Sequence, residues 1–161
     1  MFKRLIHYTL ILACTTAVLA SQTSLAQAED RIASVLAKAV VVAVGGGHTC
    51  LLTTGGGMKC WGNNYSGILG DGTKVDKIIP VDVSGLTSGV SAIATGHLHT
   101  CAVTTGGGAK CWGTNTSRQL GDGTTYNKTT PVDVSGLTSG VSTIAAGTTH
   151  TCALVGHLGI E

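Results

Sequence analysis

Cysteine is the residue type in this chain with the clearest chemical signature. Cys50 and Cys60 lie ten residues apart, as do Cys101 and Cys111, and each pair brackets a run of three glycines. In a hairpin that turns at those glycines, the two cysteines face each other across the strands, close enough for a disulfide. We therefore predict Cys50–Cys60 and Cys101–Cys111 disulfides, which persist in the oxidising compartments that exported proteins enter. Cys152 is left unpaired, because the same spacing would place its partner at position 162.

A metal site is the alternative interpretation of these cysteines. His48 and Cys50 form a His-x-Cys pair on one face of a strand, with Cys60 nearby. Structural zinc usually uses more closely spaced ligand pairs, so we expect neither a metal nor a cofactor. We expect His48, His99 and His150 to hold neighbouring loops through hydrogen bonds. No acid or nucleophile recurs at a suitable distance from them, so we assign no catalytic residue and predict that the chain is not an enzyme.

Aspartate and tryptophan leave two further alternatives open. Asp71 and Asp122 stand in Gly-Asp-Gly-Thr turns, where the carboxylate could bind calcium or cap its own turn. One carboxylate per loop is few for calcium, so capping is the favoured interpretation. Trp61 and Trp112 follow the second cysteine of each pair and could form an exposed recognition surface or pack between sheets, and we favour packing.

The elements that position these residues follow from an internal repeat. The tripeptide His-Thr-Cys stands at residues 48–50, 99–101 and 150–152, so the period is 51 residues. Lys-Cys-Trp-Gly, Leu-Gly-Asp-Gly-Thr and Pro-Val-Asp-Val-Ser-Gly-Leu each recur at the same interval. A fixed period of this length indicates an array, a solenoid or a propeller.

Strand and turn signals fill each repeat. Val90–Thr95 and Val141–Ala146 are short apolar runs that end at glycine. His99–Thr105 and Ala109–Gly113 flank three glycines that can supply the positive φ of a hairpin turn. We place a further strand at Pro131–Val134, because a proline at the first position of an edge strand needs no N–H. Three or four short strands per 51 residues match one propeller blade, so the predicted fold class is all-β, a partial β-propeller.

The N-terminal residues have a different character. Lys3 and Arg4 precede an apolar run from Leu5 to about Ala20, and Ala26-Gln27-Ala28 offers a small-x-small cleavage site. This pattern predicts an exported protein (periplasmic, cell-surface or extracellular) with no membrane contact after the signal is cleaved. The predicted divisions are a signal peptide, a linker or short helix, and about two and a third repeats, over residues 1–28, 29–38 and 39–161.

The charge balance excludes one class of partner. Ten lysines and arginines stand against eight acids, and loss of Lys3 and Arg4 leaves eight against eight. The exported chain is then neutral apart from histidine, and no basic surface remains to release counterions from a phosphate backbone. We therefore do not expect nucleic acid as a partner.

Two long motifs of the repeat resemble a known family. The first is the run Ile93–Val103, echoed at residues 144–154, and the second is Cys111–Asn115 followed by Gln-Leu-Gly-Asp-Gly at residues 119–123. Over roughly residues 39 to 154 the chain resembles the repeat of the regulator of chromosome condensation (RCC1) family. The resemblance implies a seven-bladed parent propeller of about 51-residue repeats. This chain has two and a third repeats, so by that resemblance it corresponds to a fragment of such a propeller.

The resemblance also bears on function. The family's best-known eukaryotic member is a nucleotide exchange factor for a small nuclear GTPase. The paired cysteines, however, resemble those of exported bacterial members, some of which bind another protein, including inhibitors of β-lactamase. This implies a non-enzymatic, secreted or cell-surface protein-interaction module whose protein partner is unknown. The alternatives are nucleotide exchange on a small GTPase and a truncated gene product with no independent function, and open blade edges would also allow self-association.

Overall fold

The computed structural model describes residue 27 and residues 29–156. The predicted signal peptide lies outside these residues, apart from Gln27. Residues 29–36 are helical, within the segment where the sequence predicts a linker or short helix. The helix and the repeats are separate compact units that divide between Ala37 and Lys38. Within the described part of the chain, no helix has the length and apolar character needed to cross a membrane.

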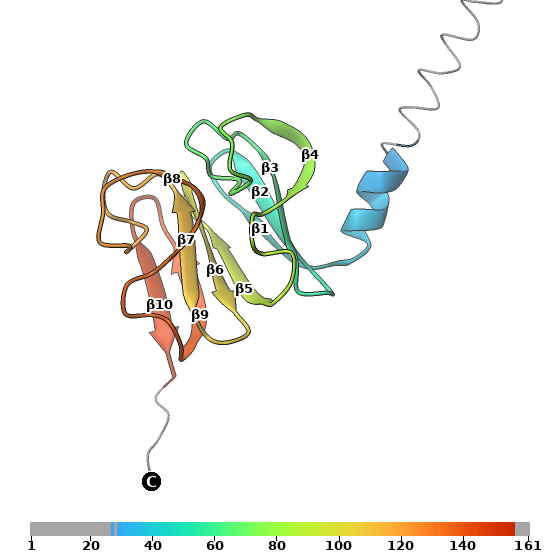
Figure 1. Cartoon of the computed structure of the whole chain (residues 1–161). Helices are drawn as coiled ribbons and strands as arrows, with labels where there is room; N and C mark the ends of the chain where they lie inside the picture. Colours follow the sequence, from blue (N-terminus) through green and yellow to red (C-terminus); the bar gives the residue numbers. More distant parts are fainter. Residues whose placement is uncertain (1–26, 28, 157–161) are drawn as a thin grey trace, which may run out of the picture. The chain divides into compact units, whose positions relative to one another are not determined.

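Ten strands in the described residues form three antiparallel sheets (Figure 1). The strands are β1 Ala39–Val44, β2 His48–Thr53, β3 Met58–Gly62, β4 Lys77–Asp82, β5 Val90–Thr95, β6 His99–Thr104, β7 Ala109–Gly113, β8 Lys128–Asp133, β9 Val141–Ala146 and β10 Thr151–Val155. Blade 1 has the order β1-β2-β3-β4, blade 2 has the order β5-β6-β7-β8, and β9 with β10 forms the third sheet, here called half-blade 3. The prediction of an all-β partial propeller is confirmed.

The hairpins β2–β3 and β6–β7 turn at the glycine runs. Gly56 and Gly107 have φ angles of 73° and 78°, in the left-handed region that glycine adopts without steric cost. The resulting registers place Cys50 opposite Cys60 in blade 1 and the equivalent pair opposite each other in blade 2. Turn chemistry in the sequence thus determines which side chains meet across each hairpin.

The strand predicted at Pro131–Val134 begins earlier in the structure. β8 runs from Lys128, so Pro131 lies inside the strand rather than at its first position. The pairing of β8 with β7 shifts between Cys111 and Gly113, and the proline falls within that irregular stretch. Because β8 is an edge strand and the ladder is interrupted there, no ladder hydrogen bond requires the missing N–H.

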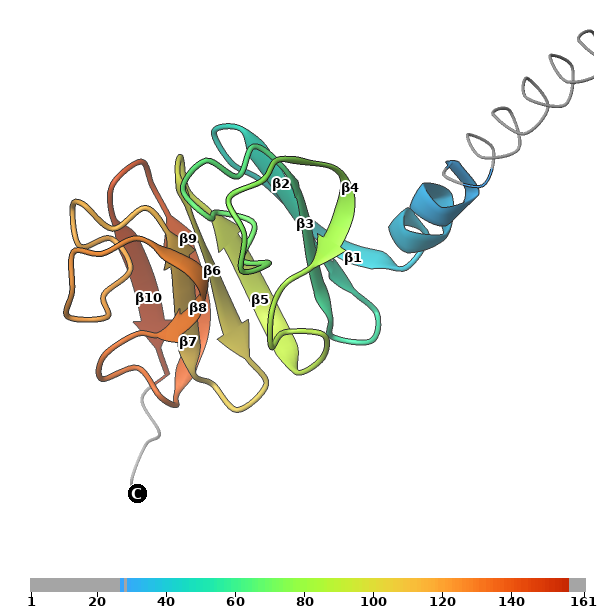
Figure 2. The same ribbon diagram turned by 45° about the horizontal axis from the view of Figure 1, so that its top comes forward.

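The three sheets pack side by side through apolar side chains (Figure 2). One buried cluster joins Leu52 and Val83 of blade 1 to Trp112 of blade 2. A second joins Leu120 of blade 2 to Ile144 of half-blade 3. Each blade therefore completes the core of its neighbour, as in other repeat arrays.

Candidate functional site

Both disulfides at the predicted spacing are present in the structure. Cys50 is bonded to Cys60 and Cys101 to Cys111, with Cα atoms 4.1 Å apart in each pair. This separation is typical of a non-hydrogen-bonded antiparallel pair. Cys152 on β10 is free and exposed. No group of three or more His, Cys, Asp or Glu side chains in the described ranges is arranged to hold a metal ion.

His48 connects blade 1 to blade 2. Its Nε2 atom lies 2.8 Å from Oγ1 of Thr100, whose hydroxyl donates at 2.8 Å to the carbonyl of Ile68. Because the threonine proton is directed to the carbonyl, the hydroxyl oxygen accepts from Nε2–H of His48. This contact requires a proton on Nε2, and the buried Nδ1 atom has no hydrogen-bond partner among the described residues.

His99 makes the same connection from blade 2 to half-blade 3. Its Nε2 atom lies 2.8 Å from Oγ1 of Thr151, which donates at 2.8 Å to the carbonyl of Gln119. His48 and His99 thus have the predicted role of holding a neighbouring loop through hydrogen bonds. Each bonds to a strand threonine, and that threonine bonds to a loop carbonyl. The third histidine, His150, is exposed.

Burial sets the protonation state of both linking histidines. Burial, together with the neighbouring His99, lowers the pKa of His48 from 6.5 to about 4. Burial and His150 likewise lower the pKa of His99. Both rings are therefore neutral at neutral pH, and the neutral tautomer that carries its proton on Nε2 makes the contact with threonine.

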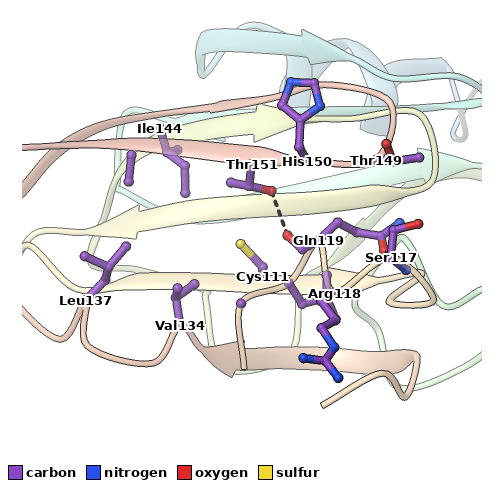
Figure 3. Close-up of a pocket in the computed structure, with 13 residues that line it drawn as sticks. Cys111, Ser117, Arg118, Gln119, Val134, Leu137, Ile144, Thr149, His150 and Thr151 are labelled. Carbon is purple, nitrogen blue, oxygen red and sulfur yellow. Dashed lines mark hydrogen bonds between the residues drawn. The ribbon is translucent and has the colours of Figure 1, made fainter. Parts of the chain in front are cut away.

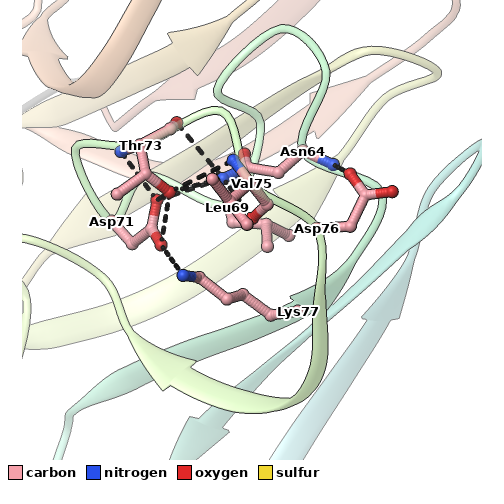
Figure 4. A network of polar contacts seen from close by, with 7 residues as sticks. All are labelled: Asn64, Leu69, Asp71, Thr73, Val75, Asp76 and Lys77. Carbon is pink, nitrogen blue, oxygen red and sulfur yellow. Dashed lines mark hydrogen bonds and ion pairs between the residues drawn. The ribbon is translucent and has the colours of Figure 1, made fainter.

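Asn64 organises the long loop between β3 and β4 (Figure 4). Its Nδ2 donates to Asp71 Oδ1 at 3.1 Å and to the carbonyls of Thr73 and Val75 at 3.2 Å. Its Oδ1 accepts from the backbone N–H of Leu69 at 3.0 Å. Asn64 is fully buried, so one carboxamide holds loop segments before and after the Gly-Asp-Gly-Thr turn.

Asp71 caps its own turn, as the favoured interpretation holds. Its carboxylate accepts from the Thr73 N–H at 2.9 Å and from the Thr73 hydroxyl at 2.8 Å, and Lys77 Nζ lies 3.4 Å away. Burial opposes ionisation of Asp71, but the hydrogen bonds from Thr73 and Asn64 and the charge of Lys77 outweigh it and lower the pKa. The oxygens that a calcium ion would need are already engaged by donors of the chain.

Blade 2 repeats this loop network. Asn115 Nδ2 donates to Asp122 Oδ1 at 2.9 Å, Asp122 accepts from the Thr124 N–H at 2.9 Å, and Lys128 lies 3.4 Å from Asp122. Hydrogen bonds from Thr124 and Asn115 outweigh burial and lower the pKa of Asp122. The two long loops therefore share one internal hydrogen-bond network, here called the loop frame. It consists of Asn64, Asp71 and Thr73 in blade 1 and of Asn115, Asp122 and Thr124 in blade 2.

The exposed residues of the two loops differ in type, although the residues of the loop frame are the same in both. Tyr65 is 79% exposed, and its equivalent in blade 2 is Thr116. Val75 is 62% exposed, and its equivalent is Tyr126, which is 74% exposed. We call the exposed side chains Tyr65, Val75 and Tyr126 of the loops, together with Ile78 at the start of β4, the loop surface. The two loops thus share their internal hydrogen bonds but differ in the side chains that they expose.

Trp112 packs between blades, as the sequence analysis favours. It is fully buried, and its indole N–H donates at 2.9 Å to the Ile68 carbonyl of the preceding blade. Trp61, its equivalent in blade 1, is half-buried.

A cavity of about 220 Å³ lies between blade 2 and half-blade 3 (Figure 3). The loop that carries Arg118 and Gln119 faces the apolar side chains of Val134, Leu137 and Ile144 across it. Small-molecule sites usually begin at roughly 300 Å³. The cavity is therefore smaller than the usual small-molecule site.

Comparison with known protein families identifies the repeat. The family described as "Regulator of chromosome condensation (RCC1) repeat" matches residues 56–103 and 111–154. A second family with the same description matches residues 39–68 and 90–119. The matched ranges together cover most of the strand-forming part of the chain.

Curated relatives and solved structures agree with that match. The human protein named "Probable E3 ubiquitin-protein ligase HERC4" is 36% identical over 116 residues, which are 71% of this chain and 11% of that protein. Human WBSCR16 superposes with a TM-score of 0.66 and 28% identity, over 76% of this chain and 32% of that chain. Prp20p of Saccharomyces cerevisiae superposes over the same shares with a TM-score of 0.67 and 17% identity, which shows the fold alone. The chain spans about a tenth of the curated relative and a third of each solved protein.

Proposed function

This chain belongs to the RCC1 repeat family, and from that premise we propose that it is a non-enzymatic protein-interaction module of an exported protein, with the loop surface as its contact region. Propellers of this fold bind proteins. The crystal structure of Prp20p is described together with its binding to Gsp1p and histones, and yeast RCC1 has been solved bound to Kap60.

The contrast between the frame and the exposed side chains of the loops carries this proposal. Asn64 and Asp71 recur unchanged as Asn115 and Asp122, and all four hold the loops from inside. The exposed aromatic residue, in contrast, stands at different positions in the two loops. It is Tyr65, before the Gly-Asp-Gly-Thr turn, in blade 1 and Tyr126, after the turn, in blade 2. Tyrosine is enriched in protein interfaces, and variable loops on a rigid scaffold are the usual place for recognition.

The histidines and aspartates that recur with the 51-residue period support a scaffold rather than a catalyst. His48 and His99 engage threonine through Nε2 and are buried, so neither presents a basic nitrogen to an open cleft. Asp71 and Asp122 are held by donors of their own loops. General acid–base catalysis needs such groups within reach of a substrate, and here they serve the frame.

Export is part of the same proposal. Two buried hairpin disulfides suit the oxidising environment outside the cytoplasm. The charged and apolar N-terminal sequence that ends near Ala28 has the pattern of a secretory signal. We place the mature chain in the periplasm, on the cell surface or outside the cell.

A double substitution on the loop surface tests the proposal. The exported chain is cross-linked in its native compartment and compared with a Tyr65→Ala, Tyr126→Ala variant and with a Val42→Thr control on β1, where Val42 is 55% exposed. We expect one defined protein adduct that the double variant loses at least about tenfold, since buried interface aromatics carry about 1.5 kcal/mol or more, and that the control retains. Equal adduct yields in all three proteins would contradict the assignment of the loop surface.

A further inference from the structure

One stretch of the repeat recurs without any change. Residues 80–90, which span the end of β4, the loop to β5 and the start of β5, are identical to residues 131–141. Most residues of this stretch have a role that the structure shows. Asp82 pairs with Lys59 at 2.6 Å, three apolar side chains are buried, and two glycines adopt positive φ angles. The apolar residues are Val83, Leu86 and Val90, and the glycines are Gly85 and Gly89.

Three exposed residues of the same stretch have no such role, and all three carry a hydroxyl group. They are Ser84, Thr87 and Ser88. Their hydroxyls have no hydrogen-bond partner in the described part of the chain, whereas the hydroxyl of Ser91 in β5 donates to the carbonyl of Val103 at 3.2 Å. We call residues 84–89 and their equivalents, residues 135–140, the hydroxyl loops.

The backbone of each hydroxyl loop lies against a run of three glycines. In blade 1, a Cβ atom on Gly57 would lie 2.5 Å from the carbonyl oxygen of Thr87. In blade 2, a Cβ atom on Gly108 would lie 2.9 Å from the carbonyl oxygen of Thr138. Because glycine lets the loop backbone approach this closely, the side chains of the hydroxyl residues are left facing solvent.

The hydroxyl loop of blade 1 stays exposed with the following blade in place. The Thr105 N–H of blade 2 donates to the Gly89 carbonyl at 2.8 Å, and Figure 2 shows the loop after β4 beside the β6–β7 turn. Thr87 and Ser88 are exposed nonetheless. Since β3 and β4 run antiparallel, this loop and the long loop between those two strands lie at opposite ends of the blade.

Exposed residues at the long-loop end change between the same two repeats. Tyr65 is replaced by Thr116, and Lys74 is replaced by Thr125. The two repeats are thus not alike at every exposed position, so the unchanged hydroxyl loops need a cause of their own. Turn geometry requires glycine where φ is positive, but the other positions of such turns accept many residue types. The fold alone therefore does not require a hydroxyl residue at all three positions.

The surface chemistry of the hydroxyl loops is neutral and polar. None of the large apolar residues exposed in the described part of the chain lies in them. The nearby charges are paired with each other, Lys59 with Asp82 and Lys110 with Asp133. Protein interfaces are enriched in aromatic residues and arginine, and nucleic-acid interfaces need a basic surface. These loops therefore offer hydroxyl groups between glycines rather than a surface for either macromolecule.

We propose that the hydroxyl loops are O-glycosylation sites, in which Ser84, Thr87 and Ser88 and their equivalents 51 residues later carry sugars. The unchanged loop sequence presents the same acceptor to a glycosyltransferase in each blade, and the neighbouring glycines leave room for the sugar. Surface glycans are bulky and solubilising, and these cover the end of the blades that lies away from the long loops. This inference shares with the proposed function only the export of the chain.

The reaction is a glycosyl transfer from a sugar activated as a glycosyl phosphate. The hydroxyl oxygen of Thr87 attacks the anomeric carbon of the sugar, and a carbon–oxygen bond forms between them. The bond from that carbon to the phosphate oxygen breaks, and the phosphate leaves with the electron pair. A basic group of the transferase takes the hydroxyl proton. No atom is oxidised or reduced.

Intact mass of the chain purified from the exported fraction tests the proposal. We expect a chain without residues 1–28 whose mass exceeds that of its sequence by whole sugar residues, and which returns to the sequence mass after chemical removal of O-linked sugars. Fragment spectra should place the sugars on residues 84–88 and 135–139. The bare sequence mass of residues 29–161 would overturn glycosylation and leave export standing. A chain that retains residues 1–28 and carries no sugar would contradict both.

Matched variants assign the sugars to the hydroxyl loops. The triple variant Ser84→Ala, Thr87→Val, Ser88→Ala should lose the sugar of blade 1 and keep that of blade 2. The control Thr116→Val, Thr125→Val removes two exposed hydroxyls that do not recur in the other repeat, and it should keep all sugars. Exposed substitutions of this kind change stability little, so both variants should fold. An unchanged glycan mass in the triple variant, or sugar found only outside the hydroxyl loops, would overturn the proposal.

Discussion

His48 stabilises the fold in its neutral form, and this predicts a pH dependence. Its pKa is about 4 in the folded chain instead of 6.5. As the pH falls below 6.5, His48 therefore becomes protonated in the unfolded chain, whereas in the folded chain it stays neutral until about pH 4. The stabilising contribution is complete above pH 6.5 and is lost as the pH falls toward 4, at a total cost on the order of 3 kcal/mol.

Urea unfolding between pH 8 and pH 4 measures this dependence. We expect the free energy of unfolding to be flat above about pH 7 and to fall below it. In a His48→Gln variant, which keeps a donor toward Thr100, the fall should be shallower because one titrating group has been removed. An identical pH profile in the variant would show that His48 does not titrate as described.

Asn64 and its neighbour Asn63 form a matched pair for testing the loop frame. Asn64 is fully buried and bonds on both sides of the turn, whereas Asn63 is exposed. Asn64→Ala leaves buried donors and acceptors without partners, at a cost of about 1–3 kcal/mol each. Thermal unfolding should show a large decrease in the free energy of unfolding for Asn64→Ala and a decrease below about 1 kcal/mol for Asn63→Ala.

Residue spacing in the sequence was enough to predict the disulfides, the capping role of Asp71 and the packing of Trp112. It did not single out Asn64 or Thr100, although the equivalents Asn115 and Thr151 recur at the same interval. The reason is physical, since their importance lies in which distant carbonyls they reach, and a repeat pattern does not encode that geometry. Recurrence of a polar residue in every copy was the signal available.

Among the elements, the short strands bounded by glycine were the most predictable. β5, β7 and β9 match the predicted bounds, because an apolar run between turn residues leaves little freedom for the strand ends. β8 was predicted too short, since its proline was taken as the start of the strand. The irregular pairing with β7 accommodates Pro131, and such irregularities depend on the neighbouring strand rather than on local sequence.

The contact between elements of adjacent blades depends on glycine at one position per repeat. A Cβ atom on Gly96 would lie 2.5 Å from the carbonyl oxygen of Gly147 and would collide with the His99 ring, whereas one on Gly55 would meet no atom closer than 3.9 Å. Gly96→Ala should therefore destabilise the fold by about 1–3 kcal/mol. Gly55→Ala should change it by no more than about 0.5 kcal/mol.

Guanidinium chloride unfolding of the two alanine variants checks this contrast. The two substitutions are chemically identical, so a difference in midpoint reports the close packing around Gly96, against the His99 ring of its own blade and the Gly147 carbonyl of half-blade 3. Equal midpoints would mean that neither the His99 ring nor the Gly147 carbonyl lies as close to Gly96 as the structure has them.

For the whole molecule, the account predicts a defined thiol count. The five cysteines that follow the predicted signal peptide are Cys50, Cys60, Cys101, Cys111 and Cys152. Chain purified from the exported fraction should react with one equivalent of a thiol-alkylating reagent under denaturing conditions, and with five after reduction. Intact mass should rise by four hydrogens on reduction. Five reactive thiols before reduction would contradict the pairing and the oxidising compartment together.

Each disulfide closes a short loop, because its two cysteines are separated by 10 positions in the sequence. Loops of this size limit the unfolded chain enough to contribute about 2–4 kcal/mol. For a chain whose blades complete one another's cores, that contribution supports the scaffold on which the loops are displayed. The disulfides, the buried asparagines and the neutral histidines thus all serve to hold the loop surface in place.

Site-specific photo-cross-linking tests the central claim, that the loop surface is where this chain meets its partner. A photoreactive residue is placed in turn at positions 65, 126 and 42 of the exported chain, and adducts formed in the native compartment are identified by mass spectrometry. The account predicts the same partner protein attached at positions 65 and 126 and no adduct at position 42. Adducts at position 42 alone, or none at positions 65 and 126, would contradict it.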